Sequence, residues 1–193
     1  MCTYKNLSEE NLLEFVKKSN ESAIAEFLQR YKSKFFTSAY LLVKDRYIAE
    51  DIFQEASIKI IQSIRSGKYN DAGKFLPWAL RITRNLAIDY LRTCKKMPKI
   101  SLPDGQDVFS ILNFGHQNAE EGIIEMQSHS RVRKMLDLIP YEQREVIVLR
   151  LFGDLSFKEI ADMTEVSINT ALGRMRYGLL NLRKIMEEKQ ILL

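Results

Sequence analysis

The sequence predicts an all-α protein made of two small helical domains joined by a linker. Only 8 glycines and 4 prolines occur among 193 residues, which argues against a turn-rich all-β protein. Apolar residues recur at three- and four-residue intervals over long stretches on both sides of the middle of the chain. Between about residues 96 and 119 this periodicity fades, and proline, glycine and polar residues accumulate. We therefore expect helical domains over residues 1–95 and 120–193.

Four helices are predicted in the N-terminal domain. Ser8 is a favourable N-cap, and the two glutamates that follow it suit the positive end of a helix dipole. A second helix is expected over residues 22–43, where apolar side chains follow helical spacing. A third is expected over residues 47–64, where isoleucine and alanine recur at every fourth position. Pro77 is typical of a first helical turn, so a fourth helix should begin there and continue to about Cys94.

The helical pattern returns beyond the linker. One helix precedes Pro140, where a second begins, and Gly153 stops that second helix. Ser156 is followed three residues later by Glu159, which is the capping-box pattern that marks a helix start. A last helix should begin near Ser167. The C-terminal domain is therefore expected to end in two consecutive helices with a short turn between them.

These last two helices have the pattern of a helix-turn-helix, since the small Ala161 lets them cross closely. The second helix carries short hydrogen-bonding side chains first and arginines later, an order that matches base edges and then phosphates. Its candidate DNA-binding residues are Ser167, Asn169, Thr170, Arg174 and Arg176. Glu165 occupies the turn position usually held by glycine, where a positive φ would cost about 1 kcal/mol. An ordinary helical hairpin with solvated arginines would show a similar pattern.

The helix that begins near Pro77 carries a tryptophan on its polar side. On a helical wheel, Trp78 falls among side chains that face away from the apolar side, namely Arg81, Asn85, Asp89 and Arg92. Such a face is suited to single-stranded nucleic acid, because the indole stacks on an unpaired base, the amide reads its edge and the cations hold phosphates. The alternative is that Trp78 folds into the core.

The predicted third helix presents an acidic face made of Asp51, Gln54 and Glu55. Catalytic carboxylates would need a pocket and a partner group, and the neighbouring sequence supplies neither. A solvated helix face is the simplest interpretation. Docking to a basic partner is a further one.

The net charge is +4, and the charged residues are unevenly distributed along the sequence. Residues 74–99 contain seven basic residues and one acidic residue, and residues 166–186 contain four basic residues and no acidic one. Between them, residues 103–125 contain five acidic residues and no lysine or arginine. This pattern indicates two surfaces for a polyanion, joined by a segment with another role.

Several other classes of protein are disfavoured. Cys2 and Cys94 are too few for a disulfide framework or a cysteine-rich zinc site, and His116 and His129 lack metal-ligand spacing. We find no glycine-rich phosphate loop, secretory signal or apolar run of about 20 residues that could span a bilayer. We expect a cytoplasmic, non-enzymatic protein without a cofactor, a bound metal or membrane insertion.

Taken in this order, the patterns resemble bacterial RNA polymerase sigma factors of the extracytoplasmic-function (ECF) class over nearly the whole chain. Residues 51–55 resemble the Asp-x-x-Gln-Glu signature of the family's second region, and residues 78–92 resemble its promoter-melting helix. Residues 138–146 resemble the opening of the fourth region, with Ile139 where leucine is usual. Residues 156–176 resemble the helix-turn-helix of that region.

The resemblance implies a sigma factor that directs RNA polymerase to specific promoters and initiates transcription. Its partners would be the polymerase core, promoter DNA as duplex and as non-template single strand, and an anti-sigma factor. Docking to the core would involve Asp51, Gln54 and Glu55. Melting of the minus-ten element would involve Trp78, Arg81, Asn85 and Arg92. Reading of the minus-thirty-five element would involve Ser167, Asn169, Thr170, Arg174 and Arg176. The acidic linker, residues 96–119, would thread toward the basic channels of the polymerase.

Two features depart from the family pattern, namely Glu165 at the turn and Ala171-Leu172-Gly173 in the recognition helix, where a basic side chain is usual. A stand-alone helix-turn-helix regulator with an N-terminal sensor domain is a rival interpretation. It would bind duplex DNA as a dimer, bury Trp78 and leave the acidic face unused. An enzyme that uses Asp51 and Glu55 is a second rival.

Overall fold

The computed structural model describes residues 4–69, 73–96 and 134–189, and all the regular structure in these ranges is helical. The elements are η1 (Tyr4–Asn6), α1 (Glu9–Lys17), α2 (Glu21–Val43), α3 (Arg46–Arg65), α4 (Phe75–Lys96), α7 (Tyr141–Leu151), α8 (Phe157–Thr164) and α9 (Ile168–Glu188). The predicted all-α class is therefore confirmed. Lys96, the first residue of the predicted linker, ends α4, whereas the rest of the linker, both histidines, Cys2 and most of the helix expected before Pro140 lie outside the described residues.

Local capping explains most helix starts. The Ser8 hydroxyl accepts a hydrogen bond from the Asn11 backbone N–H at the start of α1, as the sequence predicts. In contrast, α4 begins at Phe75, two residues earlier than expected, so Pro77 is the third residue of the helix rather than the first. Pro77 is tolerated there because the first four backbone N–H groups of a helix have no intrahelical acceptor.

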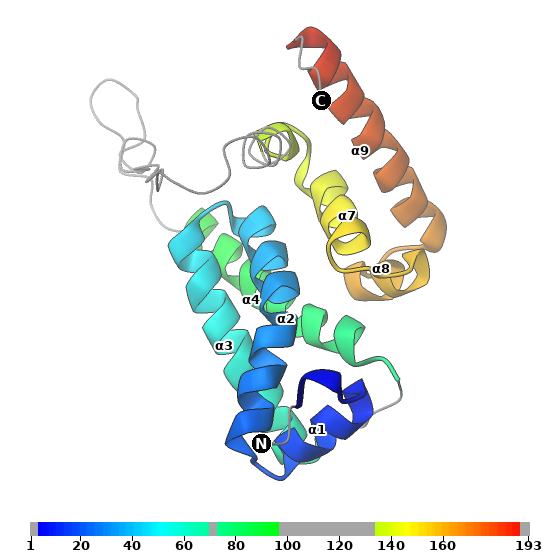
Figure 1. The fold of residues 1–193 in the computed structure, drawn as a ribbon. Coiled ribbons are helices and arrows are strands. Elements are labelled where there is room, and N and C mark those ends of the chain that lie inside the picture. The colour runs from blue at the N-terminus through cyan, green and yellow to red at the C-terminus, as the bar shows by residue number, and fades with distance from the viewer. Residues whose placement is uncertain (1–3, 70–72, 97–133, 190–193) are drawn as a thin grey trace, which may run out of the picture.

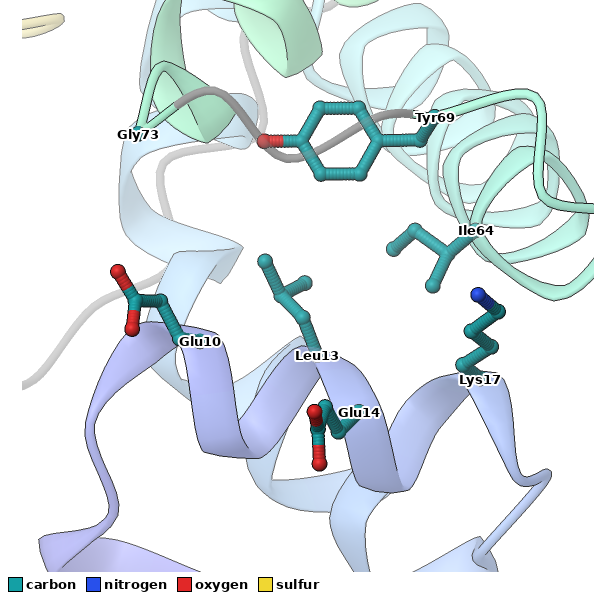
Figure 2. Close-up of a pocket in the computed structure, with 7 residues that line it drawn as sticks. All are labelled: Glu10, Leu13, Glu14, Lys17, Ile64, Tyr69 and Gly73. Carbon is teal, nitrogen blue, oxygen red and sulfur yellow. The ribbon is translucent and has the colours of Figure 1, made fainter.

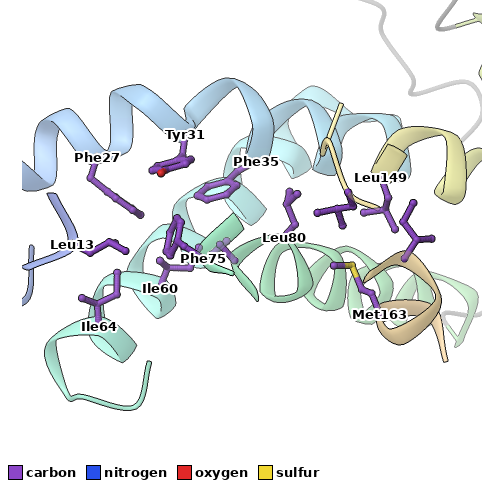
Figure 3. Packing of buried hydrophobic residues seen from close by; sticks show 14 of the residues in the cluster. Leu13, Phe27, Tyr31, Phe35, Ile60, Ile64, Phe75, Leu80, Leu149 and Met163 are labelled. Carbon is purple, nitrogen blue, oxygen red and sulfur yellow. The ribbon is translucent and has the colours of Figure 1, made fainter. Parts of the chain in front are cut away.

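An aromatic cluster holds the N-terminal half together. Figure 1 shows α2, α3 and α4 running side by side, with α1 across one end. The rings of Phe27, Tyr31 and Phe75 meet with centroids 5.0–5.4 Å apart, and Phe35 stacks on Tyr31 at 5.7 Å. Figure 3 shows these rings between α2 and α4, with Ile60 of α3 below them. This core holds α3 and α4 against α2, with one face of each turned to solvent.

Helix α7 and the helix-turn-helix form a second group of helices that lies against α2 (Figure 1). Both groups contribute to one buried cluster, in which Leu80 of α4 lies near Leu149 of α7 and Met163 of α8 (Figure 3). Gly153 sits at this junction. A Cβ added there would lie 2.6 Å from the Leu149 carbonyl oxygen and 3.0 Å from Leu80 Cδ1. The glycine therefore allows a close approach of the two groups, in addition to following the end of α7.

The turn between α8 and α9 has the backbone that the sequence predicts. Glu165 is the C-cap of α8 and adopts a left-handed conformation with φ 57° and ψ 43°. Glycine is favoured in this region because it has no Cβ, whereas other L-residues lose about 1 kcal/mol or more. The turn is therefore formed at a cost that the packing of α8 and α9 offsets.

Glu165→Gly should stabilise the protein by about 1 kcal/mol, which raises the melting temperature by roughly 2–4 °C for a chain of this size. Asp162→Gly is the matched control, because Asp162 is an exposed residue inside α8, where glycine should lower stability by about 0.3 kcal/mol relative to aspartate. Thermal unfolding followed by circular dichroism measures both. A decrease in melting temperature for both variants would contradict the proposed strain at Glu165.

Candidate functional site

The acidic face predicted on the third helix is exposed. Asp51, Gln54 and Glu55 all lie on the solvent side of α3, while Ile52 and Ala56 of the same helix are buried. Glu55 also forms an ion pair with Lys59, one turn further along, with Nζ and Oε1 2.7 Å apart. An exposed i, i+4 pair of this kind contributes only about 0.3–0.5 kcal/mol. Both carboxylates therefore remain accessible to a partner.

The burial of Trp78 is intermediate between the two alternatives, a ring on the exposed polar face and a ring in the core. Its side chain is half-buried, and its ring centroid lies 4.4 Å from that of Tyr69 and 5.9 Å from that of Phe75. Tyr69 precedes α4 by several residues, and periodicity within the helix gave no sign of this contact. The indole thus packs at the margin of the core with part of its surface still open.

Tyr69 also borders a pocket between α1 and the segment that follows α3. Figure 2 shows its ring on one side of the pocket and Leu13 of α1 pointing toward it. Glu10, Glu14 and Lys17 of α1 line the same space. Side chains of both charges therefore border this pocket.

The polar side chains of α4 divide into an outward and an inward group. Arg81, Asn85 and Arg92 are exposed, as the sequence predicts. Arg92 lies 3.6 Å from Asp89, a loose surface pair that leaves the guanidinium available. Arg84, in contrast, is largely buried and pairs with Glu145 of α7 at 2.8 Å. The basic stretch is therefore only partly available to phosphates.

Cys94, near the end of α4, is an exposed free thiol, as expected. Its hydrogen bond with Tyr90, together with partial burial, raises the pKa of that phenol to about 12. Within the described residues, no group of three or more histidine, cysteine or acidic side chains could hold a metal ion.

The helix-turn-helix is built by caps and small residues. Ser156 and Glu159 form the predicted capping box, with the Ser156 N–H donating to Glu159 Oε2 at 2.8 Å. Partial burial acts to raise the pKa of Glu159, but the hydrogen bonds from Ser156 outweigh it and lower that pKa. Ala161 of α8 and Ala171 of α9 are both buried and belong to the same apolar cluster, and the two helices contact each other.

The predicted reading residues gather at the N-terminal end of α9. Asn169 and Arg176 are exposed and Arg174 is half-buried. The Ser167 hydroxyl caps α9 by accepting from the Thr170 backbone N–H at 3.0 Å, and the two hydroxyls lie 2.9 Å apart. Both hydroxyls are exposed but already have a local partner. Asn169 is the one amide among these five residues, and its side chain is exposed.

The apolar row of α9 is only partly buried. Ala171 is buried, but Leu179, eight positions further along, is 48% exposed. Gly178 is the residue that faces α7, where an added Cβ would lie 2.8 Å from Ile147 Cδ1. Leu179 helps to form a shallow apolar groove that helical spacing alone does not predict. The groove is lined by Phe157, Leu172, Met175, Arg176, Leu179, Leu180 and Arg183.

Comparisons with known proteins agree with the motifs. Residues 27–96 match Sigma-70 region 2, and residues 129–175 match Sigma-70, region 4. The ECF RNA polymerase sigma factor SigW of Bacillus subtilis is 30% identical over 175 residues, which cover 88% of this chain and 91% of SigW. The RNA polymerase sigma factor SigV of the same organism is 29% identical over 174 residues, 90% of this chain and 96% of SigV.

Two solved structures share the fold. CnrH, solved in complex with the cytosolic domain of CnrY, has a TM-score of 0.65 at 17% identity and covers 93% of this chain and 97% of its own. The sigma factor RpoE of Bartonella quintana, solved with the anti-sigma factor NepR, has a TM-score of 0.62 at 17% identity, with 84% and 97% covered. Among the described helices, none is long and apolar enough to cross a membrane. The chain belongs to the ECF class of bacterial RNA polymerase sigma factors.

Proposed function

We propose that this sigma factor directs RNA polymerase to its promoters through three separate surfaces. The acidic face (Asp51, Gln54 and Glu55) docks on basic residues of the polymerase core. The outer face of α4 captures the melted non-template strand at the minus-ten element. The N-terminal end of α9 reads the minus-thirty-five duplex. The observation that carries the proposal is that these three sets, predicted separately, all have exposed members on different helices.

Each surface has the chemistry that its partner requires. Carboxylates attract a basic protein surface and repel DNA, so α3 is suited to the polymerase rather than the promoter. On α4, Trp78 offers an aromatic edge for an unstacked base, Asn85 an amide for its polar edge and Arg81 a cation for the phosphates. On α9, Asn169 can pair with a base edge while Arg176 contacts the backbone.

We further infer that the chain is a non-enzymatic subunit that works in the cytoplasm and is held inactive by an anti-sigma factor. The support is the family membership together with NepR, the anti-sigma factor seen with RpoE. Domain limits of 1–95 and 120–193, with an acidic linker over 96–119, remain part of this proposal.

The direct test is run-off transcription with core polymerase, this protein and genomic DNA, followed by mapping of the start sites. New start sites that depend on the protein and share two upstream elements are expected. A stand-alone regulator would instead bind duplex DNA without polymerase and would create no new start sites when only core polymerase is supplied. That result would overturn the proposal.

Asn169 and Arg176 should differ in what they contribute to minus-thirty-five binding. Asn169→Ala should weaken binding of the holoenzyme by about 1–3 kcal/mol and relax the preference at one base pair. Arg176→Ala should weaken binding uniformly across sequences and reduce its salt dependence. Lys184→Ala, further along the exposed side of α9, is the control. Binding to a set of promoter variants at two salt concentrations separates these outcomes, and identical profiles for the first two variants would contradict the assignment.

A further inference from the structure

Helix α9 contains two glycines with different surroundings. Gly178 packs against α7, and a Cβ added there would lie 2.8 Å from Ile147 Cδ1. A Cβ added at Gly173, in contrast, would have no neighbouring side chain or other segment of the described chain within 4 Å. Gly173 is also not among the described residues with a positive φ, so its backbone does not require glycine. The packing of this chain therefore accounts for Gly178 but not for Gly173.

Glycine is unfavourable at position 173. It is the sixth residue of the 21-residue helix α9 and thus lies inside the helix rather than at a cap. Glycine is among the poorest residues for a helix interior, because it loses more conformational freedom on folding than alanine does. Alanine would fit here without meeting a neighbour and would stabilise the helix. A partner that approaches α9 closely from outside would account for glycine at this position.

Gly173 lies in the middle of the face that the proposed function turns toward DNA. Asn169 is one turn before it and Tyr177 one turn after it, so the three residues form one row along the helix. Asn169 is exposed and Tyr177 is 61% exposed, whereas Gly173 is less exposed than either. The row therefore has a gap at Gly173, with an amide on one side and an aromatic ring on the other. We call this gap the Gly173 notch.

The Gly173 notch offers van der Waals contact and no free hydrogen-bonding group. Glycine has no side chain, and inside a helix its backbone N–H and C=O groups are bonded to residues four positions away. A phosphate oxygen would need a donor, and the polar edge of a base would need a hydrogen-bonding partner. The apolar group that base edges present in the major groove is the C5-methyl of thymine. That methyl group is the part of duplex DNA that suits the notch.

We propose that the Gly173 notch receives the methyl group of one thymine in the minus-thirty-five element, which makes Gly173 a specificity-determining residue. The inference rests on the proposed role of α9 in reading that element. Without a side chain at this position, α9 lies closer to the base pairs. Asn169 and Arg176, which are both exposed on the same side of the helix, then reach a neighbouring base edge and the backbone.

Substitutions of Gly173 should change stability and DNA binding in opposite directions. Gly173→Ala and Gly173→Leu introduce good helix formers at an unobstructed position and should raise the melting temperature by about 2–4 °C. With core polymerase, the same two variants should bind the promoter duplex about fivefold and at least about fiftyfold more weakly, because the added side chain overfills the notch. Gly178→Ala is the stability control and should lower the melting temperature, since its Cβ would meet Ile147.

Replacement of thymine by uracil tests the methyl group directly. The promoter is one mapped by run-off transcription, and each thymine of its upstream element is replaced in turn by deoxyuridine, which pairs in the same way but lacks the methyl. One of these positions should weaken binding of the parent holoenzyme by about fourfold, as expected for the loss of one buried methyl group. The Gly173→Ala holoenzyme should bind the same uracil promoter at least as tightly as the thymine promoter, because its own methyl group fills the space. Uracil at the other positions should affect both proteins equally.

Three results would overturn the inference. They are binding of Gly173→Ala as tight as that of the parent, a uracil effect that is independent of residue 173 at every position, and a melting temperature that falls in Gly173→Ala. Weaker association of Gly173→Ala with core polymerase alone would also reject it, and would indicate a protein helix as the occupant of the notch. If binding of the parent holoenzyme depends on no upstream duplex element, the proposed function fails and this inference fails with it. Dependence in the parent without any effect of residue 173 rejects only the notch.

Discussion

Replacing both Asp51 and Glu55 by lysine should abolish binding of this chain to core polymerase. Both side chains are exposed and lie one turn apart on α3, so the double variant changes the charge of one small face by four units. Charge reversal at a docking surface sets like charges against each other and costs several kcal/mol. The fold should survive, because the only described ion pair lost is that of Glu55 with Lys59 at the surface. Pull-down with core polymerase, with circular dichroism in parallel, measures both effects.

A matched pair on another helix controls for charge alone. Glu10 and Glu14 are also exposed acids one turn apart, on α1, and Glu10→Lys with Glu14→Lys makes the same change in net charge. This control should bind polymerase nearly as the parent does. Equal loss in the two double variants would point to a general charge effect, and unchanged binding of the Asp51/Glu55 variant would remove the docking assignment.

Trp78→Ala should impair strand opening more than binding to duplex promoter. Stacking of one base on an aromatic ring is worth about 1–3 kcal/mol, which corresponds to roughly 5- to 150-fold in the opened fraction. The closed complex depends on α9 and on phosphate contacts, so its affinity should change little. Permanganate reactivity of unpaired thymines reports opening, and gel-shift titration at low temperature reports duplex binding.

The partial burial of Trp78 makes a second variant necessary. Truncation also removes its contacts with Tyr69 and Phe75, which should lower stability by about 2 kcal/mol, less than the 3–5 kcal/mol typical of a fully buried tryptophan. Trp78→Phe retains an aromatic ring for both roles and should restore most of the opening. Equal loss of opening and of duplex binding in Trp78→Ala would favour a purely structural role.

The location of most helices followed from neighbouring residues. Ser8, Ser156 with Glu159, and Ser167 each cap a helix through atoms no more than three residues away. Because such hydrogen bonds are local, they can be predicted from spacing alone. The left-handed backbone at Glu165 was predictable for the same reason. The order of the motifs then identified the family, since each motif is itself a short run of residues.

The fate of individual side chains was harder to predict, because it depends on residues far away in the chain. Arg84 counted as one more cation of a basic stretch, yet its partner Glu145 is 61 residues away and removes it from the exposed surface. The partial burial of Trp78 involves a ring contact with Tyr69, a residue outside α4 that helical spacing does not reveal. Leu179 follows Ala171 and Met175 at helical spacing, yet it is exposed while Ala171 is buried.

Most helices, their caps, the ECF family and the three candidate surfaces could be predicted from spacing along the chain, because each of these depends on residues within a few positions of one another. The packing of the two groups of helices against each other, the lack of space for a side chain at Gly153 and the inward position of Arg84 became visible only in the folded chain. The physical reason is that burial and ion pairing are set by whichever distant segment supplies the opposing surface. Helical periodicity shows which side of a helix is apolar, but it carries no information about the partner that covers it.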